Sequence, residues 1–291
     1  MDLITVGDVM VDVHVEAPAI KRGGDVHGRV RLQPAGTSAN AAVWAAWDGA
    51  SARVHGRVGG DLGGRLLEDA LAERGVEPAL AFDEGAPTGT MLVVVEAGER
   101  SMVADRGANA RLEPGDLPSS FAAGAVLVSG YLVLQEPTTD VALEALRRSR
   151  ATFTGVEAAS WPLVESFGAA AFIDRTADAG ADAVFANDRE AEVLTGAQGR
   201  EAARRLGERF RLACVKRGAE GAVMSLAGSL IETRAGQIDE IDPTGAGDAF
   251  DGVLLGALGR GVDPAEALGR ACRAGARVAA SSSTWPEADP S

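Results

Sequence analysis

Residues 242–250 read Asp-Pro-Thr-Gly-Ala-Gly-Asp-Ala-Phe, and an apolar helical run follows them as far as Leu258. Small residues at 245–247 let the backbone approach a ligand closely, and the free N–H groups of the first helical turn then point at that ligand. The positive end of the helix dipole strengthens this attraction for anions. The stretch therefore predicts a phosphate-binding turn. Within it, Asp248 either caps the helix or accepts a proton from an attacking hydroxyl group.

On both sides of this stretch, strands and helices alternate. Strands are expected at 125–129, 151–156, 183–186, 211–216 and 222–226, and helices at 138–149, 189–194, 200–209, 245–260 and 264–281. The N-terminal part adds strands at 3–6 and 52–58 and helices at 39–48 and 63–74. Such alternation is typical of a mostly parallel sheet with helices on both faces.

Two segments depart from this alternation and predict a small separate sheet. Residues 11–32 alternate between polar and apolar side chains around a glycine-rich centre, and residues 90–96 and 101–104 flank a hairpin turn at 97–100. We therefore expect a β lid made of residues 11–32 and 87–104, and a large domain made of residues 1–10, 33–86 and 105–291. The final residues 284–291 contain two prolines and are expected to be loose.

Composition excludes several functional classes. The net charge of −14 leaves no basic footprint for nucleic acid or for an anionic membrane. Neither a signal peptide nor an uncharged stretch of transmembrane length is visible, so a cytoplasmic location is expected. Two cysteines in apolar surroundings and three scattered histidines indicate neither a disulfide framework, nor a metal cluster, nor a histidine-based triad.

Apart from Pro243, which stands where Thr is usual, residues 242–250 resemble the second signature of the pfkB, or ribokinase-like, family of carbohydrate kinases. The resemblance implies a three-layer α/β/α fold with a small β lid. It also implies ATP-dependent phosphorylation of a hydroxyl group on a small sugar or sugar-like acceptor. In this reading Asp248 is the general base, and the amides of Gly245, Ala246 and Gly247 form the anion hole for the transferred phosphoryl group.

A second motif resembles the part of the family that binds the acceptor substrate. Residues 35–42 read Ala-Gly-Thr-Ser-Ala-Asn-Ala-Ala and resemble the N-terminal signature of the family, with Ala35 in place of the first glycine. From the residues alone, Asn40 can equally be an ordinary residue in the first turn of a helix. The substrate-binding residues that the resemblance implies are Asp12, Gly36, Thr37, Asn40, Arg106, Gln135 and Asp248.

Two further motifs resemble the parts of the family that bind the nucleotide and the metal ion. Residues 187–190, Asn-Asp-Arg-Glu, resemble the Asn-x-x-Glu element with which the family organises Mg²⁺, largely through water, although the same residues also form a capping-box variant. Residues 216–221 resemble the strand-end turn near ATP, and phosphate contact by Lys216 is a hypothesis. The implied nucleotide ligands are Asn187, Lys216, Gly218, Gly221, Gly245 and Gly247, and the implied Mg²⁺ residues are Asn187 and Glu190.

The resemblance allows a monovalent-cation site but does not require one. Asp242 and Thr244 match positions that help to bind K⁺ in some members of the family, whereas the loop at 281–284 departs from their pattern. A homodimer through the lid is expected, because exposed lid strands would otherwise leave open edges.

The sequence leaves three alternatives to a sugar kinase to compare. A nucleoside kinase of the same fold is the first, although a lid segment poor in aromatic residues favours a sugar. A non-catalytic sugar-binding or regulatory protein is the second, and the presence of both base and anion hole argues against it. A dinucleotide oxidoreductase is the third, but it needs Gly-x-Gly-x-x-Gly after the first strand, which residues 7–10 do not supply.

Overall fold

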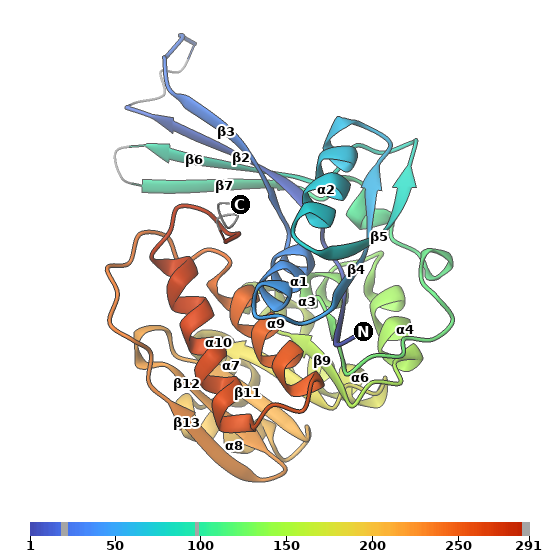
Figure 1. Cartoon of the computed structure of the whole chain (residues 1–291), viewed down its shortest axis with the longest axis vertical. Helices are drawn as coiled ribbons and strands as arrows, with labels where there is room; N and C mark the ends of the chain where they lie inside the picture. Colours follow the sequence, from blue (N-terminus) through green and yellow to red (C-terminus); the bar gives the residue numbers. More distant parts are fainter. Residues whose placement is uncertain (19–22, 97–98, 287–291) are drawn as a thin grey trace.

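A computed structural model describes residues 1–18, 23–96 and 99–286 of the chain (Figure 1). Its central sheet has nine strands in the order β13-β12-β11-β10-β9-β8-β1-β4-β5, and those from β11 to β5 run parallel. β12 pairs in antiparallel orientation with both β11 and β13, so it alone of the nine strands runs in the opposite direction. The bounds are β1 (Leu3–Val6), β4 (Ala52–Gly59), β5 (Val76–Asp83), β8 (Ala125–Val128), β9 (Phe153–Glu157), β10 (Ala183–Asn187), β11 (Leu212–Lys216), β12 (Ala222–Leu226) and β13 (Ser229–Thr233). The mostly parallel sheet predicted from the sequence is confirmed.

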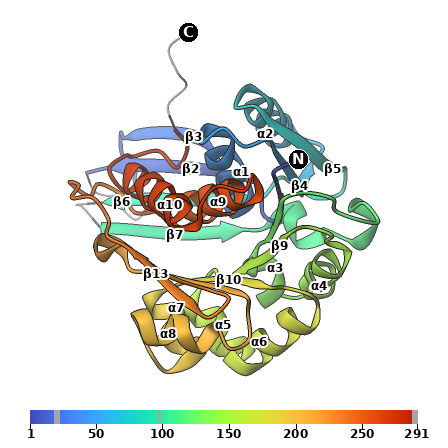
Figure 2. The same cartoon turned by 60° about the horizontal axis from the view of Figure 1, so that its bottom comes forward.

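Helices cover both faces of this sheet, so it has two apolar cores (Figure 2). Successive strand residues point to opposite faces, and in β8 Leu127 enters one core while Val126 enters the other. One core packs against α1 (Thr37–Trp47), α2 (Leu62–Glu73), α9 (Ala246–Gly259) and α10 (Pro264–Ala279). The other packs against α3 (Gly130–Leu134), α4 (Thr139–Arg148), α5 (Trp161–Phe167), α6 (Ala169–Asp178), α7 (Asp188–Thr195) and α8 (Gly199–Leu206). The predicted three layers are therefore present.

The helices α1 and α9 approach each other unusually closely. A Cβ atom placed on Gly252 of α9 would lie 2.0 Å from the carbonyl oxygen of Ala41 in α1, so only glycine fits there. Along the same contact α1 carries alanines, whose small side chains let the two helix backbones lie close together. This close packing brings the N-terminal ends of the two helices together, and both ends carry motif residues.

A separate four-stranded sheet lies beside the large sheet, in the order β3-β2-β6-β7 (Figure 1). Its strands are β2 (Met10–Ala17), β3 (Arg29–Ala35), β6 (Thr90–Glu96) and β7 (Glu99–Asp105), and β2 pairs in parallel with β6. The expected hairpin pairing of β6 with β7 is present, although turn residues 97 and 98 lie outside the described residues. The proposed division of the chain into lid and large domain stays a prediction.

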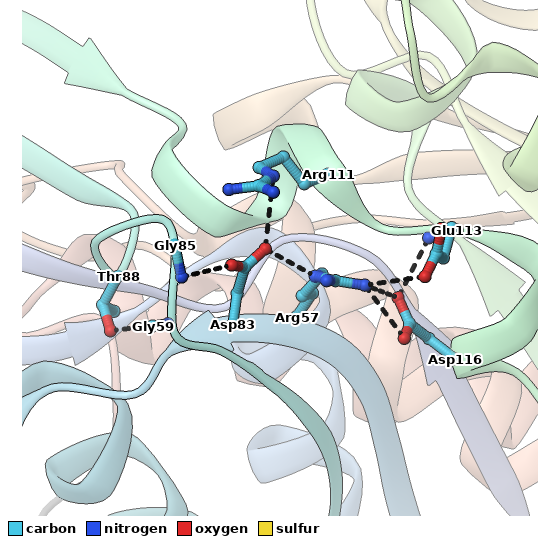
Figure 3. Close-up of polar contacts among 8 residues, drawn as sticks. All are labelled: Arg57, Gly59, Asp83, Gly85, Thr88, Arg111, Glu113 and Asp116. Atoms are coloured by element: carbon cyan, nitrogen blue, oxygen red, sulfur yellow. Dashed lines mark hydrogen bonds and ion pairs between the residues drawn. The ribbon is translucent and has the colours of Figure 1, made fainter.

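Three 3₁₀ turns complete the structure: η1 (Gly107–Arg111), η2 (Pro114–Asp116) and η3 (Gly218–Glu220). Around η1 and η2, Arg57 of β4 joins three carboxylates (Figure 3). Its guanidinium donates to Asp83 at the end of β5 at 3.0 Å and to Asp116 at 2.8 Å, and it lies 3.4 Å from Glu113. This network ties the edge of the central sheet to the segment that follows the lid.

Two edge strands and three short helices were not expected from the sequence: β5, β13, α3, α5 and α6. Pro78 interrupts the strand pattern of β5, and it is tolerated because β5 lies at the sheet edge. The expectation of a loose tail over 284–291 was wrong for its described part. Thr284 and Trp285 are each only 5% exposed, because an apolar indole gains more from burial than from solvent. Residues 287–291 lie outside the described residues.

Candidate active site

A pocket of about 1310 Å³ lies over the carboxyl ends of the parallel strands. The strand order reverses between β1 and β8, and ligands of open α/β sheets bind in the crevice at such a point. Four polar residues enter the pocket from the strand ends: Asp8 follows β1, Glu157 ends β9, Asn187 ends β10 and Lys216 ends β11. The pocket is therefore built by the topology of the sheet.

Asp248 occupies the first turn of α9 at the wall of this pocket. Gly245 precedes the helix at φ +79°, a left-handed conformation that glycine adopts without strain, and the turn can thus direct its N–H groups toward the pocket. Burial raises the pKa of Asp248 to about 7, against the opposing effects of a hydrogen bond from Asn40 and the charge of Lys216. A carboxyl group of this pKa beside an amide-rich turn can accept a proton at neutral pH.

Lys216 brings a positive charge to the same turn. Its Nζ lies 3.3 Å from the position that a Cβ atom on Gly247 would occupy, and 2.6 Å from Oδ2 of Asp251. Burial opposes the charge, but the carboxylates of Asp251, Glu190 and Glu157 outweigh it and raise the pKa of Lys216. The ammonium is therefore charged at neutral pH, beside amides that favour an anion.

Asn187 and Glu190 form a reciprocal capping box at the start of α7. The amide N–H of Glu190 donates to Asn187 Oδ1 at 2.9 Å, and the amide N–H of Asn187 donates to Glu190 Oε2 at 2.8 Å. Both residues also line the pocket, so the capping role and a ligand role are compatible. Among the described residues no group of three or more acidic, histidine or cysteine side chains could hold a metal by itself. Mg²⁺ fits a sparser site, because it keeps several waters and uses one or two carboxylates together with substrate phosphates.

The acceptor side of the pocket faces the lid. Asn40, Gly36 and Thr37 come from the start of α1, while Asp12 comes from β2 and Gln135 follows α3. Asn40 donates through Nδ2 to Asp248 Oδ2 at 2.8 Å, which links this side to the turn of α9.

Arg106 completes the acceptor side. Its side chain is 17% exposed and lies 3.7 Å from Asp8, while its Nη2 donates to Thr138 Oγ1 at 3.1 Å. Its Nε is buried and has no hydrogen-bond partner among the described residues, and the residue itself lines the pocket.

The opposite end of the pocket suits a flat heterocycle. Gly218 and Gly221 line it from the turn after β11, and α10 adds the small residues Gly275, Ala276 and Ala279. Small side chains leave an open, weakly polar slot beside the phosphate-binding turn. An adenine nucleotide fits this arrangement of slot, turn and ammonium group.

Of the residues predicted from the sequence, Asp242 alone does not line the pocket. It accepts a hydrogen bond from the amide of Thr244 at 3.0 Å just outside it, while Thr244 is part of the wall. Sequence reasoning assigned no role to Asp8, Tyr131 or Glu157, which also line the pocket. A polar residue directly after a buried strand was the available signal for Asp8 and Glu157, since strand ends of parallel sheets meet at one edge.

A family model described as "pfkB family carbohydrate kinase" matches residues 1–289 of the chain. The chain is 30% identical to 2-dehydro-3-deoxygluconokinase of Thermoproteus tenax, over 96% of its own length and 88% of that protein. It is 32% identical to fructokinase of Klebsiella pneumoniae, over 82% and 81%.

Solved structures show the same fold. Adenosine kinase from Sinorhizobium meliloti superposes with a TM-score of 0.87 at 23% identity, over 98% of this chain and 95% of that one. Ribokinase from Thermotoga maritima gives a TM-score of 0.83 at 20% identity, with the same two coverages. No helix among the described residues has the length and apolar character needed to cross a bilayer.

Proposed function

The chain belongs to the pfkB family of carbohydrate kinases and is a phosphotransferase with a hydroxyl acceptor, and from this premise we propose that Asp248 is its general base. The observation that carries the proposal is the carboxyl group of Asp248 in the first turn of α9, with a pKa raised to about 7 by burial. ATP would supply the phosphoryl group when bound, and Asn187 and Glu190 would hold Mg²⁺, whose charge would offset that of the phosphates.

In the proposed reaction, Asp248 takes the proton of the acceptor hydroxyl as the new oxygen–phosphorus bond forms and the bond to ADP breaks. The N–H groups of Gly245 and Gly247 hold the charge that develops on the phosphoryl oxygens. The N–H of Ala246, which was also expected to do so, instead donates to the carbonyl oxygen of Pro243 at 3.1 Å. Lys216 adds a cation beside them, since its Nζ lies 3.3 Å from the Cβ position of Gly247. Positioning and electrostatic stabilisation supply most of the catalysis in reactions of this kind.

A keto-sugar acid is the acceptor that we propose first. Arg106 offers a buried Nε donor that no described group uses, and a carboxylate is the natural partner of a guanidinium. Asp12, Asn40 and Gln135 provide acceptors and donors for hydroxyl groups around it. The related 2-dehydro-3-deoxygluconokinase, by its name, acts on a substrate of this class.

A nucleoside is the second candidate acceptor. Met91 and Met102 face the pocket from the lid, and thioether side chains can pack against a flat base. A nucleoside brings no carboxylate to Arg106, whose guanidinium lies 3.7 Å from Asp8, and the sugar acid therefore stands first.

The proposal also includes a monovalent-cation site and a cellular location. The turn formed by Asp242 and Thr244 is our proposed monovalent-cation site, which a comparison of turnover in K⁺ and in tetramethylammonium tests. A cytoplasmic location is proposed because the donor is ATP.

We also propose a homodimer through the outer lid face. The strand register places one set of apolar side chains on the side of the lid sheet opposite Asp12 and the pocket. Val30 and Val103 are each 64% exposed and Leu32 is 60% exposed, so a continuous apolar surface meets solvent in the monomer. The outer lid face consists of Val13, Val15, Val30, Leu32, Leu92, Val94 and Val103.

The test of the base is Asp248→Asn, assayed for acceptor-dependent ATP consumption with 2-keto-3-deoxygluconate, fructose, ribose and adenosine. We expect turnover to fall a hundredfold or more, roughly the value of general-base catalysis, while ATP binding persists. Asp140→Asn is the matched control, because its side chain is 93% exposed on α4 and should leave turnover unchanged. Near-normal turnover in Asp248→Asn would show that the base lies elsewhere.

A further inference from the structure

The indole of Trp285 reaches the proposed base through one intermediate side chain. Its Nε1–H donates to Asn40 Oδ1 at 2.8 Å, and Asn40 Nδ2 in turn donates to Asp248 Oδ2 at 2.8 Å. Trp285 is 5% exposed and Asn40 is 4% exposed, so solvent has little access to either bond. A residue from the C-terminal segment therefore ends a relay that begins at the base.

The chemistry of the three groups allows only one orientation of the central amide. An indole N–H is a donor and never an acceptor, whereas an ionised carboxylate accepts and never donates. With its oxygen toward Trp285 and its NH₂ toward Asp248, the amide of Asn40 satisfies both neighbours. A half-turn of the amide would set NH₂ against N–H and oxygen against carboxylate, and both contacts would be repulsive.

Trp285 is itself held by two helices. Trp44 of α1 donates through Nε1 to the carbonyl of the adjacent Thr284 at 2.8 Å. Arg74, just beyond α2, donates to the carbonyl of Pro286, and its guanidinium lies 5.9 Å from the centre of the Trp285 ring. The indole is thus fixed from outside the pocket, as the orienting end of a relay must be.

Thr284 also packs against the phosphate-binding turn. A Cβ atom on Gly245 would lie 3.2 Å from Thr284 Cβ and 3.5 Å from Asn40 Nδ2. The segment 284–286 therefore contacts both the turn and the side chain that touches the base. No feature of the 242–250 or 35–42 motifs requires this contact.

We propose that Trp285 is a positioning residue, whose N–H fixes the amide of Asn40 so that its NH₂ holds the carboxylate of Asp248 for proton transfer. This inference rests on the proposed role of Asp248. Because the Asn40 hydrogen bond favours the ionised carboxylate, losing the orientation should raise the pKa of Asp248. The base should then need a higher pH to become active.

Trp285→Phe tests the inference, since it keeps the ring and removes only the N–H. We expect kcat to fall about tenfold, because a misplaced catalytic group loses much of its effect, with little change in the KM for ATP. The acid limb of the pH profile of kcat/KM should move to higher pH. In an Asn40→Ala background, the same change at Trp285 should produce no further movement of that limb.

Trp44→Phe is the matched control: it removes an indole donor to the same segment but none to Asn40. It should lower thermal stability and move the acid limb less than Trp285→Phe does, because the hydrogen bond from Trp285 to Asn40 is kept. An unmoved limb in Trp285→Phe, or an equal movement in both variants, would overturn the positioning role and leave Asp248 as the base. Turnover retained in Asp248→Asn would instead overturn the proposed function, so the two failures are distinct.

Discussion

The ionisation of Asp248 affects the stability of the folded protein as well as the proposed reaction. Its pKa is about 7 in the folded protein against an ordinary value of 3.8. A carboxyl group with a raised pKa stabilises the fold below its unfolded pKa, and this contribution is lost as pH rises through the folded pKa. Above pH 7 the charged group is therefore held in the fold at a cost of stability.

We predict that Asp248→Asn is more stable than the native protein at pH 8, by about 2 kcal/mol after allowance for the open side of the pocket. The asparagine keeps an oxygen for the Asn40 hydrogen bond. Urea unfolding at pH 4 and pH 8 checks this, with Asp140→Asn as control. The gain in free energy of unfolding should be small at pH 4 and large at pH 8. A gain that does not change with pH would contradict the prediction.

Sequence reasoning at the scale of single residues succeeded where a motif carried the chemistry. Asp248, Gly245 and Asn40 all follow from short patterns, and they line one pocket. Trp285 could not be found in this way, because its contact with Asn40 spans 245 positions and depends on how the C-terminal segment packs. Asp251, the partner of Lys216, lies on the inner face of an apolar helix and gives no signal until the fold is known.

At the scale of elements, the Arg57 network of Figure 3 fastens β4 and β5 to η2. Asp83 is 4% exposed, and removing Arg57 leaves its carboxylate with the Gly85 amide at 2.8 Å and the Arg111 guanidinium at 3.3 Å. Breaking one partner of a buried pair is costly, because the other charge stays desolvated.

We predict that Arg57→Met lowers the free energy of unfolding by more than Arg53→Met does, because Asp83 and Asp116 lose the guanidinium that they share. Arg53→Met is the matched control on the same strand: Arg53 pairs with Glu77 of β5, but their side chains are 34% and 53% exposed. An exposed pair contributes less than about 1 kcal/mol. Chemical denaturation of both variants measures the difference. Equal losses of unfolding free energy would show that the Arg57 network stabilises the protein no more than an exposed ion pair does.

Elements with a clear period were predictable, and those without one were not. The apolar face of the helix at 63–74 and the buried run at 183–186 stand out in the sequence, and the structure places α2 and β10 there within about one residue. By contrast, β13 is a half-exposed edge strand, and α5 and α6 are short helices that meet at Gly168. Tertiary contacts rather than local pattern determine such elements.

At the scale of the whole molecule, we predict that Leu32→Glu on the outer lid face separates the proposed dimer, because a charge cannot be buried there without a partner. Light scattering after size-exclusion chromatography measures the mass directly, against 29.8 kDa for one chain. Trp161→Glu is the control, since Trp161 is 39% exposed on α5, which packs against α6 and α7. A native protein that elutes as a monomer at micromolar concentration would contradict the proposal.

The overall architecture was predictable because the alternation of strands and helices leaves few topologies open, and the order of the motifs narrowed them further. The apolar character of the outer lid face was not. It emerges only when the pairing register shows that Leu32, Leu92 and Val103 lie in one row across three strands.

The place of β1 within the central sheet also bears on synthesis. β1 lies between β4 and β8, so its second edge stays open until residue 128 has been translated. At roughly 5–20 residues per second, the interval between the ends of β4 and β8 is about 3–14 s. During that interval the nascent chain exposes an edge of β1 whose backbone N–H and C=O groups are unpaired, and a chaperone that shields such edges should bind it on the ribosome.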